Sequence, residues 1–399
     1  MIPSITPKTA TQGTAYTKRI NEYPLPAAMM THELALVNNG KMIVLSQMDD
    51  STLIQLDLDD SGCPINAYSY QIGNSTSELH GVTASSSYAG DVWVTLQNDS
   101  QLLRLTPGAV ASEAPTLQAT IDVPRPGMGP HCVSEYGDDL WCSCKNPSDD
   151  TGEYYVCRVN KEDPSNYTLW TVPQSPVFVI KHPLTGEVYA SIDTDSKIVR
   201  CTPSEGDYSG TNIQTPEVID IPSTQGSTVV GMCAGPDNNI WFVLLGGSGA
   251  GTGTFGRILS DATLEFVTLG GSLGSTAGLL HLTFAPYTDG DDYRVYILSS
   301  DITKDADINQ PNAVFDVTLN PQTLAITSEV SFVFPTQYSW AHRVLYSDYG
   351  LYCTQLQTSG LVHIQLDIEG SNPAINEGGS DYQQHGIGAP YDTLVYSDD

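Results

Sequence analysis

Short apolar runs separated by polar turns recur along the whole chain. One example begins after the turn at Gly129-Pro130, where His131 opens an apolar run, and a second run, Leu140–Cys144, opens shortly afterwards. Runs of this length between turn residues are typical of β-strands rather than helices. The pair therefore predicts the first two strands of an antiparallel unit.

The unit repeats, and each copy continues into a third and a fourth run. The first runs of the seven copies are His32–Leu36, His80–Ala84, His131–Glu135, Phe178–His182, Gly231–Gly235, His281–Ala285 and His342–Tyr346. Four short strands at a period of roughly 45 to 60 residues are typical of a propeller blade. The pattern predicts an all-β fold, a seven-bladed β-propeller of four-stranded antiparallel blades that forms a single domain over residues 1–399.

The two ends of the chain explain how the ring closes. The last copy lacks a fourth strand, whereas residues 15–26 read as a strand without a blade of its own. We expect this N-terminal strand to complete the last blade and so remove an open sheet edge. Residues 1–14 then form a flexible lead-in, residues 27–368 the seven blades, and residues 369–399 a polar C-terminal tail.

Charge narrows the possible partners. The chain has 46 acidic and 16 basic residues and a formal net charge of -30. Such a surface repels phosphate backbones and anionic lipids, so we expect neither nucleic acid nor membrane as a partner. The N-terminus carries no apolar signal segment. A secretory or extracellular location after signal removal and a cytosolic location both remain open.

Cysteine spacing argues against a structural metal. Cys142, Cys144 and Cys157 fall on neighbouring strands of the third unit. A C-x-C pair on a strand lacks the C-x-x-C spacing of zinc knuckles. A cross-strand disulfide and buried free thiols are the two expectations that remain.

Five histidines occupy one position of the repeat in this alignment, the start of the innermost strand. They are His32, His80, His131, His281 and His342. In a closed propeller this position surrounds the central channel, so the five side chains should converge at one mouth. Two interpretations stay open: each imidazole caps a local turn, or several contact a ligand. Loops after the second strands should open on the same face and complete a pocket.

Three segments support a family resemblance. Pro130–Val133, Trp241–Val243 and Phe255–Ile258 resemble the repeat of the virginiamycin B lyase (streptogramin lyase) family. The resemblance implies a seven-bladed propeller. In that family magnesium, a histidine base and glutamates eliminate across a C–O bond.

The residues of this chain that match the family's glutamates carry no carboxylate. They are Gln47, Leu96, Cys144, Ile192, Leu244, Ser299 and Gln355. Magnesium prefers anionic oxygen ligands. We therefore expect no metal and no cofactor.

The repeat also resembles, in general appearance, fungal hetero-Diels–Alderases of tropolonic sesquiterpene biosynthesis. The resemblance implies a metal-independent secondary-metabolite cyclase that joins an o-quinone methide to an olefin, with a small organic molecule as substrate. The five histidines are then the expected catalytic residues, and Gln47, Phe178, Trp340 and Gln355 the expected substrate-binding residues. A C–O lyase of the streptogramin type, a calcium lactonase and a non-catalytic binding scaffold are the alternatives.

Overall fold

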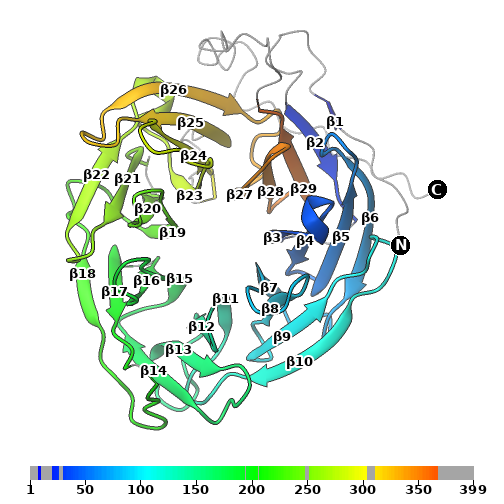
Figure 1. Ribbon diagram of the computed structural model, residues 1–399, viewed down its shortest axis with the longest axis vertical. Helices are drawn as coiled ribbons and strands as arrows, with labels where there is room; N and C mark the ends of the chain where they lie inside the picture. Colours follow the sequence, from blue (N-terminus) through cyan, green and yellow to red (C-terminus); the bar gives the residue numbers. More distant parts are fainter. Residues whose placement is uncertain are drawn as a thin grey trace.

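Seven antiparallel sheets are arranged in a ring around a central axis in the computed structural model (Figure 1). The structure describes residues 8–9, 20–26, 30–193, 195–204, 206–247, 251–302 and 311–366. The prediction of an all-β, seven-bladed propeller is confirmed. Within the described residues only two short helices occur, η1 (Asn38–Gly40) and α1 (Gly271–Gly274), and no helix has the length and apolar character needed to cross a membrane.

Each blade runs outward from the channel in sequence order. Blade one comprises β3 (Thr31–Val37), β4 (Met42–Gln47), β5 (Thr52–Leu58) and β6 (Pro64–Gln71). Blade two comprises β7 (Leu79–Ala84), β8 (Val92–Leu96), β9 (Gln101–Thr106) and β10 (Thr116–Asp122). Blade three comprises β11 (Pro130–Tyr136), β12 (Asp139–Cys144), β13 (Tyr154–Asn160) and β14 (Tyr167–Val172).

The remaining blades follow the same order. Blade four comprises β15 (Pro176–Lys181), β16 (Val188–Ile192), β17 (Lys197–Cys201) and β18 (Glu217–Asp220). Blade five comprises β19 (Val229–Ala234), β20 (Ile240–Leu244), β21 (Thr254–Ile258) and β22 (Leu264–Thr268). Blade six comprises β23 (Leu279–Phe284), β24 (Tyr293–Ser299), β25 (Ala313–Leu319) and β26 (Ile326–Val333).

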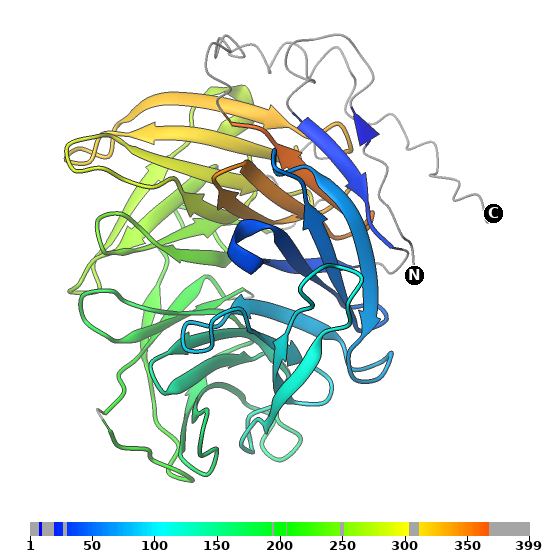
Figure 2. The same ribbon diagram turned by 45° about the vertical axis from the view of Figure 1, so that its right-hand side comes forward.

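Blade seven closes the ring with a strand from the other end of the chain. Its strands β27 (Ala341–Ser347), β28 (Gly350–Gln355) and β29 (Gly360–Ile364) are completed by β2 (Ile20–Pro24), which pairs with β29 (Figure 2). The predicted closure by the N-terminal strand is confirmed. A further short strand, β1 (Lys8–Thr9), pairs with β2 inside the segment that we expected to be a flexible lead-in. The rest of residues 1–19 and the predicted tail lie outside the described residues.

Apolar side chains of neighbouring sheets form the core. Val44 of β4 and Val94 of β8 belong to one buried apolar cluster, and Trp93 of β8 and Leu140 of β12 belong to another. Across the closure, Ile54 of blade one packs with Leu361 of β29. Because each sheet is covered on both faces by its neighbours, its strands read as nearly continuous apolar runs rather than as alternating ones.

The first strand of every blade carries a β-bulge close to the channel. On β3, for example, Thr31 pairs with Gln47 and Leu34 with Leu45, so that the first strand has one residue more than its partner. The same extra residue occurs in β7, β11, β15, β19, β23 and β27. A bulge changes the direction in which side chains point. The second and third residues of each bulge, His32 and Glu33 on β3, face the centre of the ring.

Hydroxyl side chains on the second strands hold these bulges in five blades. In blade one, Glu33 N–H donates to Ser46 Oγ (3.0 Å), and Ser46 Oγ donates to the carbonyl of His80 in blade two (2.5 Å). Each bridge thus joins one bulge to the next blade. The bridging residues are Ser46, Thr95, Ser143, Ser191 and Thr354.

Candidate functional site

Two stacked rings of side chains line the channel, one for each bulge residue. The second bulge residues form the upper ring, which consists of His32, His80, His131, Val177, Val230, Leu280 and His342. The third bulge residues form the lower ring, which consists of Glu33, Gly81, Cys132, Phe178, Gly231, His281 and Arg343.

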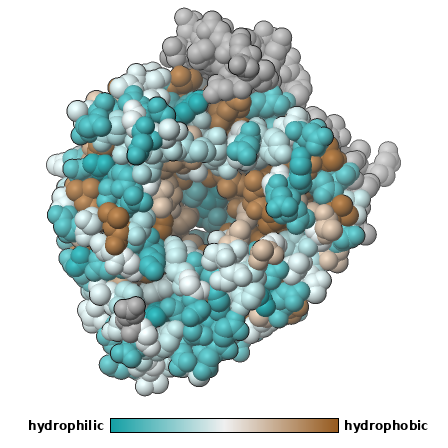
Figure 3. Space-filling view, in the orientation of Figure 1, coloured by the Kyte–Doolittle hydropathy of each residue, from teal (hydrophilic) through white to brown (hydrophobic). Residues whose placement is uncertain are grey.

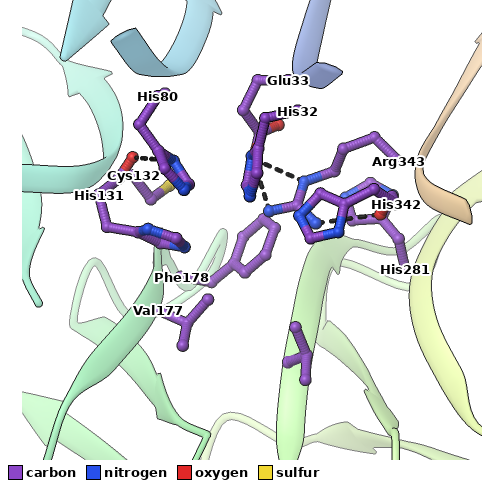
Figure 4. Close-up of polar contacts among 12 residues, drawn as sticks. His32, Glu33, His80, His131, Cys132, Val177, Phe178, His281, His342 and Arg343 are labelled. Atoms are coloured by element: carbon purple, nitrogen blue, oxygen red, sulfur yellow. Dashed lines mark hydrogen bonds and ion pairs between the residues drawn. The ribbon is translucent and has the colours of Figure 1, made fainter. Parts of the chain in front are cut away.

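The register corrects the sequence alignment at this point. His281 is the third residue of its bulge, whereas the other four histidines are the second residues of theirs. Phe178 and Gly231 are also third residues of their bulges. The sequence alignment matched the His and Phe residues of the seven copies with one another. Equivalent residues of the blades are instead those that occupy the same place in the bulge. The structure therefore brings together four of the five predicted histidines, and His281 lies in the ring below them (Figure 4).

A cavity with a volume of about 610 Å³ lies above the upper ring. Figure 3 shows the central hollow of the ring, with apolar and polar side chains on its walls. The residues that line the cavity are Met30, His32, Met48, His80, His131, Lys145, Val177, Asp193, Thr228, Val230, Leu245, Gly246, Gly247, Leu280, Ile302, His342, Arg343 and Leu356. Residues that follow second strands are among them, as the sequence predicted. A cavity of this size accommodates a small organic molecule.

The lining divides chemically into two parts. The imidazoles come from blades seven, one, two and three, whereas blades four, five and six contribute Val177, Val230 and Leu280 to the same ring. Leu245 and Ile302 extend this aliphatic wall outward. A bound molecule would therefore have hydrogen-bonding groups on one side and hydrocarbon on the other.

The four imidazoles of the upper ring form a continuous arc. Ring centroids are 3.8 Å apart for His342 and His32, 3.6 Å for His32 and His80, and 3.6 Å for His80 and His131. We call these four residues the histidine cluster. A ring nitrogen from each of His32, His80 and His131 lies within 4.8 Å of the other two.

Burial keeps the histidine cluster uncharged at neutral pH. Desolvation lowers the pKa of each of the four imidazoles well below the usual value, and the charges of Arg343 and Lys145 lower it further. Neighbouring imidazoles add to this effect in His32, His131 and His342. A neutral imidazole has one N–H donor and one nitrogen acceptor. Each imidazole of the cluster therefore has one donor and one acceptor nitrogen.

Oxygen atoms contact the Nδ1 atoms of three cluster members. Nδ1 of His80 lies 3.2 Å from the carbonyl oxygen of His131, and Nδ1 of His131 lies 3.3 Å from Oε1 of Gln97. Nδ1 of His32 lies 3.4 Å from Oε1 of Glu33, close enough for electrostatic attraction although not in hydrogen-bond geometry. Neither ring nitrogen of His342 has a hydrogen-bond partner within the described part of the chain.

A buried ion pair underlies the histidine cluster in the lower ring. The guanidinium of Arg343, 2% exposed, donates from Nε to Oε1 of Glu33 at 2.6 Å. The ring of Phe178 covers the same guanidinium, with its centroid 4.5 Å from Cζ. His281 accepts a hydrogen bond at Nδ1 from Val344 N–H, and burial lowers its pKa to about 3. Phe178 and His281 thus support the floor rather than line the cavity.

A second charged pair lies at the cavity wall. Nζ of Lys145, which follows β12, is 3.4 Å from Oδ2 of Asp193, which follows β16. Both residues line the cavity and both are partly exposed. Neither this pair nor Arg343 was predicted from the sequence. Lys145 and Asp193 directly follow second strands, and Arg343 directly follows the bulge residue His342. These positions are the signal in the sequence by which the three residues could have been assigned to the site.

Three predicted substrate-binding residues lie away from the cavity lining. Gln47 donates to the carbonyl of Pro26 and to Thr31 Oγ1. Gln355 donates to Oε1 of Glu22 at 3.1 Å on the closing strand. The backbone N–H of Trp340 donates to Oδ1 of Asp301. All three hold strand ends or loops in place through these bonds.

The donor atoms around the cavity do not fit magnesium. The upper ring offers imidazole nitrogens, and the carboxylates beside it, Glu33 and Asp193, are paired with Arg343 and Lys145. Magnesium needs oxygen ligands in near-octahedral geometry. All eight cysteines are free thiols in the structure, so the alternative of a disulfide in blade three is not realised.

Comparisons with known proteins give likeness in fold. No family model and no curated protein matches the chain. Virginiamycin B lyase from Staphylococcus aureus superposes with a TM-score of 0.62 at 15% identity, over 87% of this chain and 99% of that chain. YCF48 from Cyanidioschyzon merolae gives 0.56 at 11% identity, over 87% and 99%. A chain of the mitotic checkpoint complex gives 0.60 at 10% identity, over 86% and 90%.

These neighbours place the chain among seven-bladed propellers and indicate no common activity. One is a lyase, whereas another belongs to a complex of proteins. A fold of this kind carries many unrelated functions. The activity has to be argued from the cavity.

Proposed function

We propose that the cavity converts a small, largely apolar organic substrate by loss of water and a subsequent hetero-Diels–Alder addition to an olefin. The observation that carries the proposal is the two-sided lining, with the histidine cluster facing the aliphatic wall of Val177, Val230 and Leu280 in one cavity of about 610 Å³. A reaction at the polar end of a substrate needs hydrogen-bonding side chains, and binding of its hydrocarbon end needs an aliphatic wall. The cavity offers both.

The first step is an elimination across a C–O bond. A neutral imidazole of the histidine cluster takes the proton of the hydroxyl next to a hydroxymethyl group, while the hydroxymethyl C–O bond breaks. The imidazolium formed passes a proton to its neighbour, which gives a proton to the departing oxygen; the oxygen leaves as water and the cluster ends neutral. The o-quinone methide formed is neutral. Adjacent imidazoles 3.6 to 3.8 Å apart suit this relay, because one can act as base and its neighbour as acid.

The second step joins the quinone methide to the olefin. Its carbonyl oxygen and exocyclic carbon form one C–O and one C–C bond to the two olefin carbons, with no change in the number of atoms. Holding both partners in one orientation can supply several kcal/mol, roughly the lower part of the 7–11 kcal/mol attainable by positioning. The aliphatic wall would seat the olefin, and the N–H of His342, whose ring nitrogens have no hydrogen-bond partner within the described residues, would lower the energy of the electron-accepting carbonyl.

Lys145 has a role in this scheme as a counter-charge. Its ammonium lies at the wall beside Asp193, within the same lining as the imidazoles. The hydroxyl of a tropolone-type substrate is acidic, so its oxygen carries negative charge in part of the bound population. In a protein of net charge -30, an anionic oxygen of the substrate would share this ammonium with Asp193.

A coupled assay tests the proposal. The full chain is incubated in EDTA with a hydroxymethyl tropolone and humulene, and products are separated by mass and on a chiral column. We expect an adduct whose mass is the sum of the two partners minus water, formed as one stereoisomer. A racemic adduct at the rate seen without protein would contradict the proposal.

The streptogramin-type alternative shares the elimination and differs in the fate of its product. A C–O lyase would release an open-chain alkene and need no olefin. Replacing both partners by a macrolactone separates the two, because a lyase breaks the ring C–O bond and forms the alkene and carboxylate, whereas a cyclase leaves the macrolactone unchanged. A non-catalytic scaffold would show neither product.

A further inference from the structure

We propose that His32, His80 and His131 form a binding site for a divalent transition metal of borderline softness, of which Zn²⁺ is the representative. One ring nitrogen from each lies within 4.8 Å of the other two, at the floor of the cavity (Figure 4). The site goes beyond the proposed function, which uses the same imidazoles without a metal. It also departs from the expectation of no metal, which was based on the lack of carboxylate ligands in the sequence.

The contacts at Nδ1 prepare the opposite nitrogens for a metal. The carbonyl oxygen of His131 and Oε1 of Gln97 are acceptors, so Nδ1 of His80 and of His131 carries the proton. In His80 and His131 the lone pair then resides on Nε2. Nδ1 of His32 lies 3.4 Å from Oε1 of Glu33 without hydrogen-bond geometry. Metal-binding histidines almost always have such an oxygen partner on the other nitrogen.

Burial favours the ligand form of these side chains. A metal binds neutral imidazole, and metal affinity falls when a proton competes for the nitrogen. His32, His80 and His131 are each at most 4% exposed, and their desolvation disfavours the imidazolium. Lone pairs that converge in such a setting repel one another, and a bound cation removes this repulsion.

The donor set selects the class of metal. Three imidazoles suit Zn²⁺, Co²⁺, Ni²⁺ or Cu²⁺ and are poor ligands for Mg²⁺ and Ca²⁺. With Zn–N bonds of about 2.0–2.1 Å, tetrahedral ligand nitrogens lie roughly 3.4 Å apart. The imidazoles therefore need to turn inward by about 1 Å, and the cavity above them leaves room for this movement.

The fourth position has a candidate within the same arc. The ring of His342 lies 3.8 Å from that of His32, and neither of its nitrogens has a partner within the described residues. It is 7% exposed. An unpartnered buried imidazole beside three others either completes the tetrahedron or contacts a molecule bound at an open position. Three ligands with an open position are typical of catalytic zinc sites, and four of structural ones.

Binding of Co²⁺ tests the site without reference to turnover. The full chain, free of any affinity tag and dialysed against EDTA, is titrated with Co²⁺ while its visible d–d absorption is followed. We expect one equivalent to bind with a tetrahedral spectrum, Zn²⁺ to displace it, and excess Mg²⁺ to leave it in place. Absence of a spectrum at one equivalent, or displacement by Mg²⁺, would overturn the proposal.

Variants connect the spectrum to the three ligands. His80→Gln and His131→Gln should weaken Co²⁺ binding at least tenfold, whereas His281→Gln, in the ring below, should leave it unchanged. Gln97→Leu removes only the oxygen partner of His131 and should weaken binding about 10- to 100-fold. Circular dichroism identifies any variant that fails to fold. If a histidine variant fails to fold, Gln97→Leu still tests the site, because it keeps all four imidazoles.

The two proposals can fail separately. Adduct formation in EDTA together with no Co²⁺ spectrum would overturn the metal site and leave the cyclase intact. Stoichiometric Co²⁺ binding that is lost in His80→Gln supports the site, whatever the outcome of the substrate assay. Unchanged Co²⁺ binding in both histidine variants would place the metal elsewhere on the acidic surface and contradict the proposal.

Discussion

Arg343 of blade seven and Glu33 of blade one form an ion pair beneath the histidine cluster, with Arg343 Nε donating to Glu33 Oε1 at 2.6 Å. The two residues stand near opposite ends of the chain and at the same position of their bulges. The pair therefore crosses the closure of the ring, where β2 pairs with β29 and Thr354 bridges to the carbonyl of His32.

Breaking this ion pair should loosen the closure. Glu33→Gln leaves the buried guanidinium of Arg343 without its counter-charge and should lower the free energy of unfolding by about 3–5 kcal/mol. The double variant Glu33→Gln/Arg343→Met removes both charges and should recover part of that loss. Urea denaturation of the three proteins measures this. Equal stability of the wild type and the Glu33→Gln protein would contradict the structural role.

The hydroxyl bridges between bulges should contribute measurably to stability. Ser143 Oγ accepts from Cys132 N–H and donates to the carbonyl of Val177, so Ser143→Ala leaves two buried backbone groups without partners. We expect a loss of about 1–3 kcal/mol. Ser143→Thr, which keeps the hydroxyl as Thr95 and Thr354 do, is the matched control. A loss of the same size in both variants would point to packing instead of hydrogen bonding.

Gln355→Glu should destabilise the closing strand rather than create a metal ligand. Nε2 of Gln355 donates to Oε1 of Glu22, which also accepts from Thr336 N–H. A glutamate at position 355 replaces this donor with a second carboxylate, and we expect a loss of about 1–3 kcal/mol at neutral pH. Thermal melts over pH 4 to 8 should show the loss shrinking as the added carboxyl is protonated. A Mg²⁺-dependent rise in melting temperature would contradict this.

Glu135 should control stability in acid. Burial disfavours its ionised form, but hydrogen bonds from Lys161, Ser85 and Ser86 outweigh burial and lower the pKa to about 2. Because the folded pKa lies below the unfolded value, the stabilisation is present above about pH 4.5 and is lost as the pH falls towards 2. In Glu135→Gln the unfolding free energy should be lower at pH 7 and vary less between pH 4.5 and 2. A parallel pH profile in both proteins would contradict it.

The repeat made the blades predictable, because four apolar runs per unit and a spare N-terminal strand leave few other arrangements. The position of the site along each first strand was harder to predict. An extra residue in a nearly continuous apolar run has no periodic signature, so His281 was aligned with His32 although it belongs to the ring below.

A signal for the bulge does exist in the sequence. Ser or Thr stands one residue before the last residue of the second strand in five blades, as in Ser46 before Gln47. In blade four, Ser191 would have given the correct register for Phe178, whereas blades five and six carry Val243 and Leu298 at this position and offer no such signal for Gly231 and His281. The Lys145–Asp193 pair has no such signal, because it forms between loops of two blades whose separation depends on the ring geometry.

The rate of water loss from a hydroxymethyl tropolone, compared between His131→Gln and the matched variant His182→Gln, tests the central claim most directly. His182 is a fully buried histidine that directly follows β15 in blade four, bonds to the carbonyl of Ile258 and is not part of the cavity lining. With both variants verified as folded and assayed in EDTA with humulene, we expect a rate about 10²- to 10⁴-fold lower for His131→Gln and near the wild-type rate for His182→Gln. Equal rates in the two variants would contradict the proposed role of the histidine cluster.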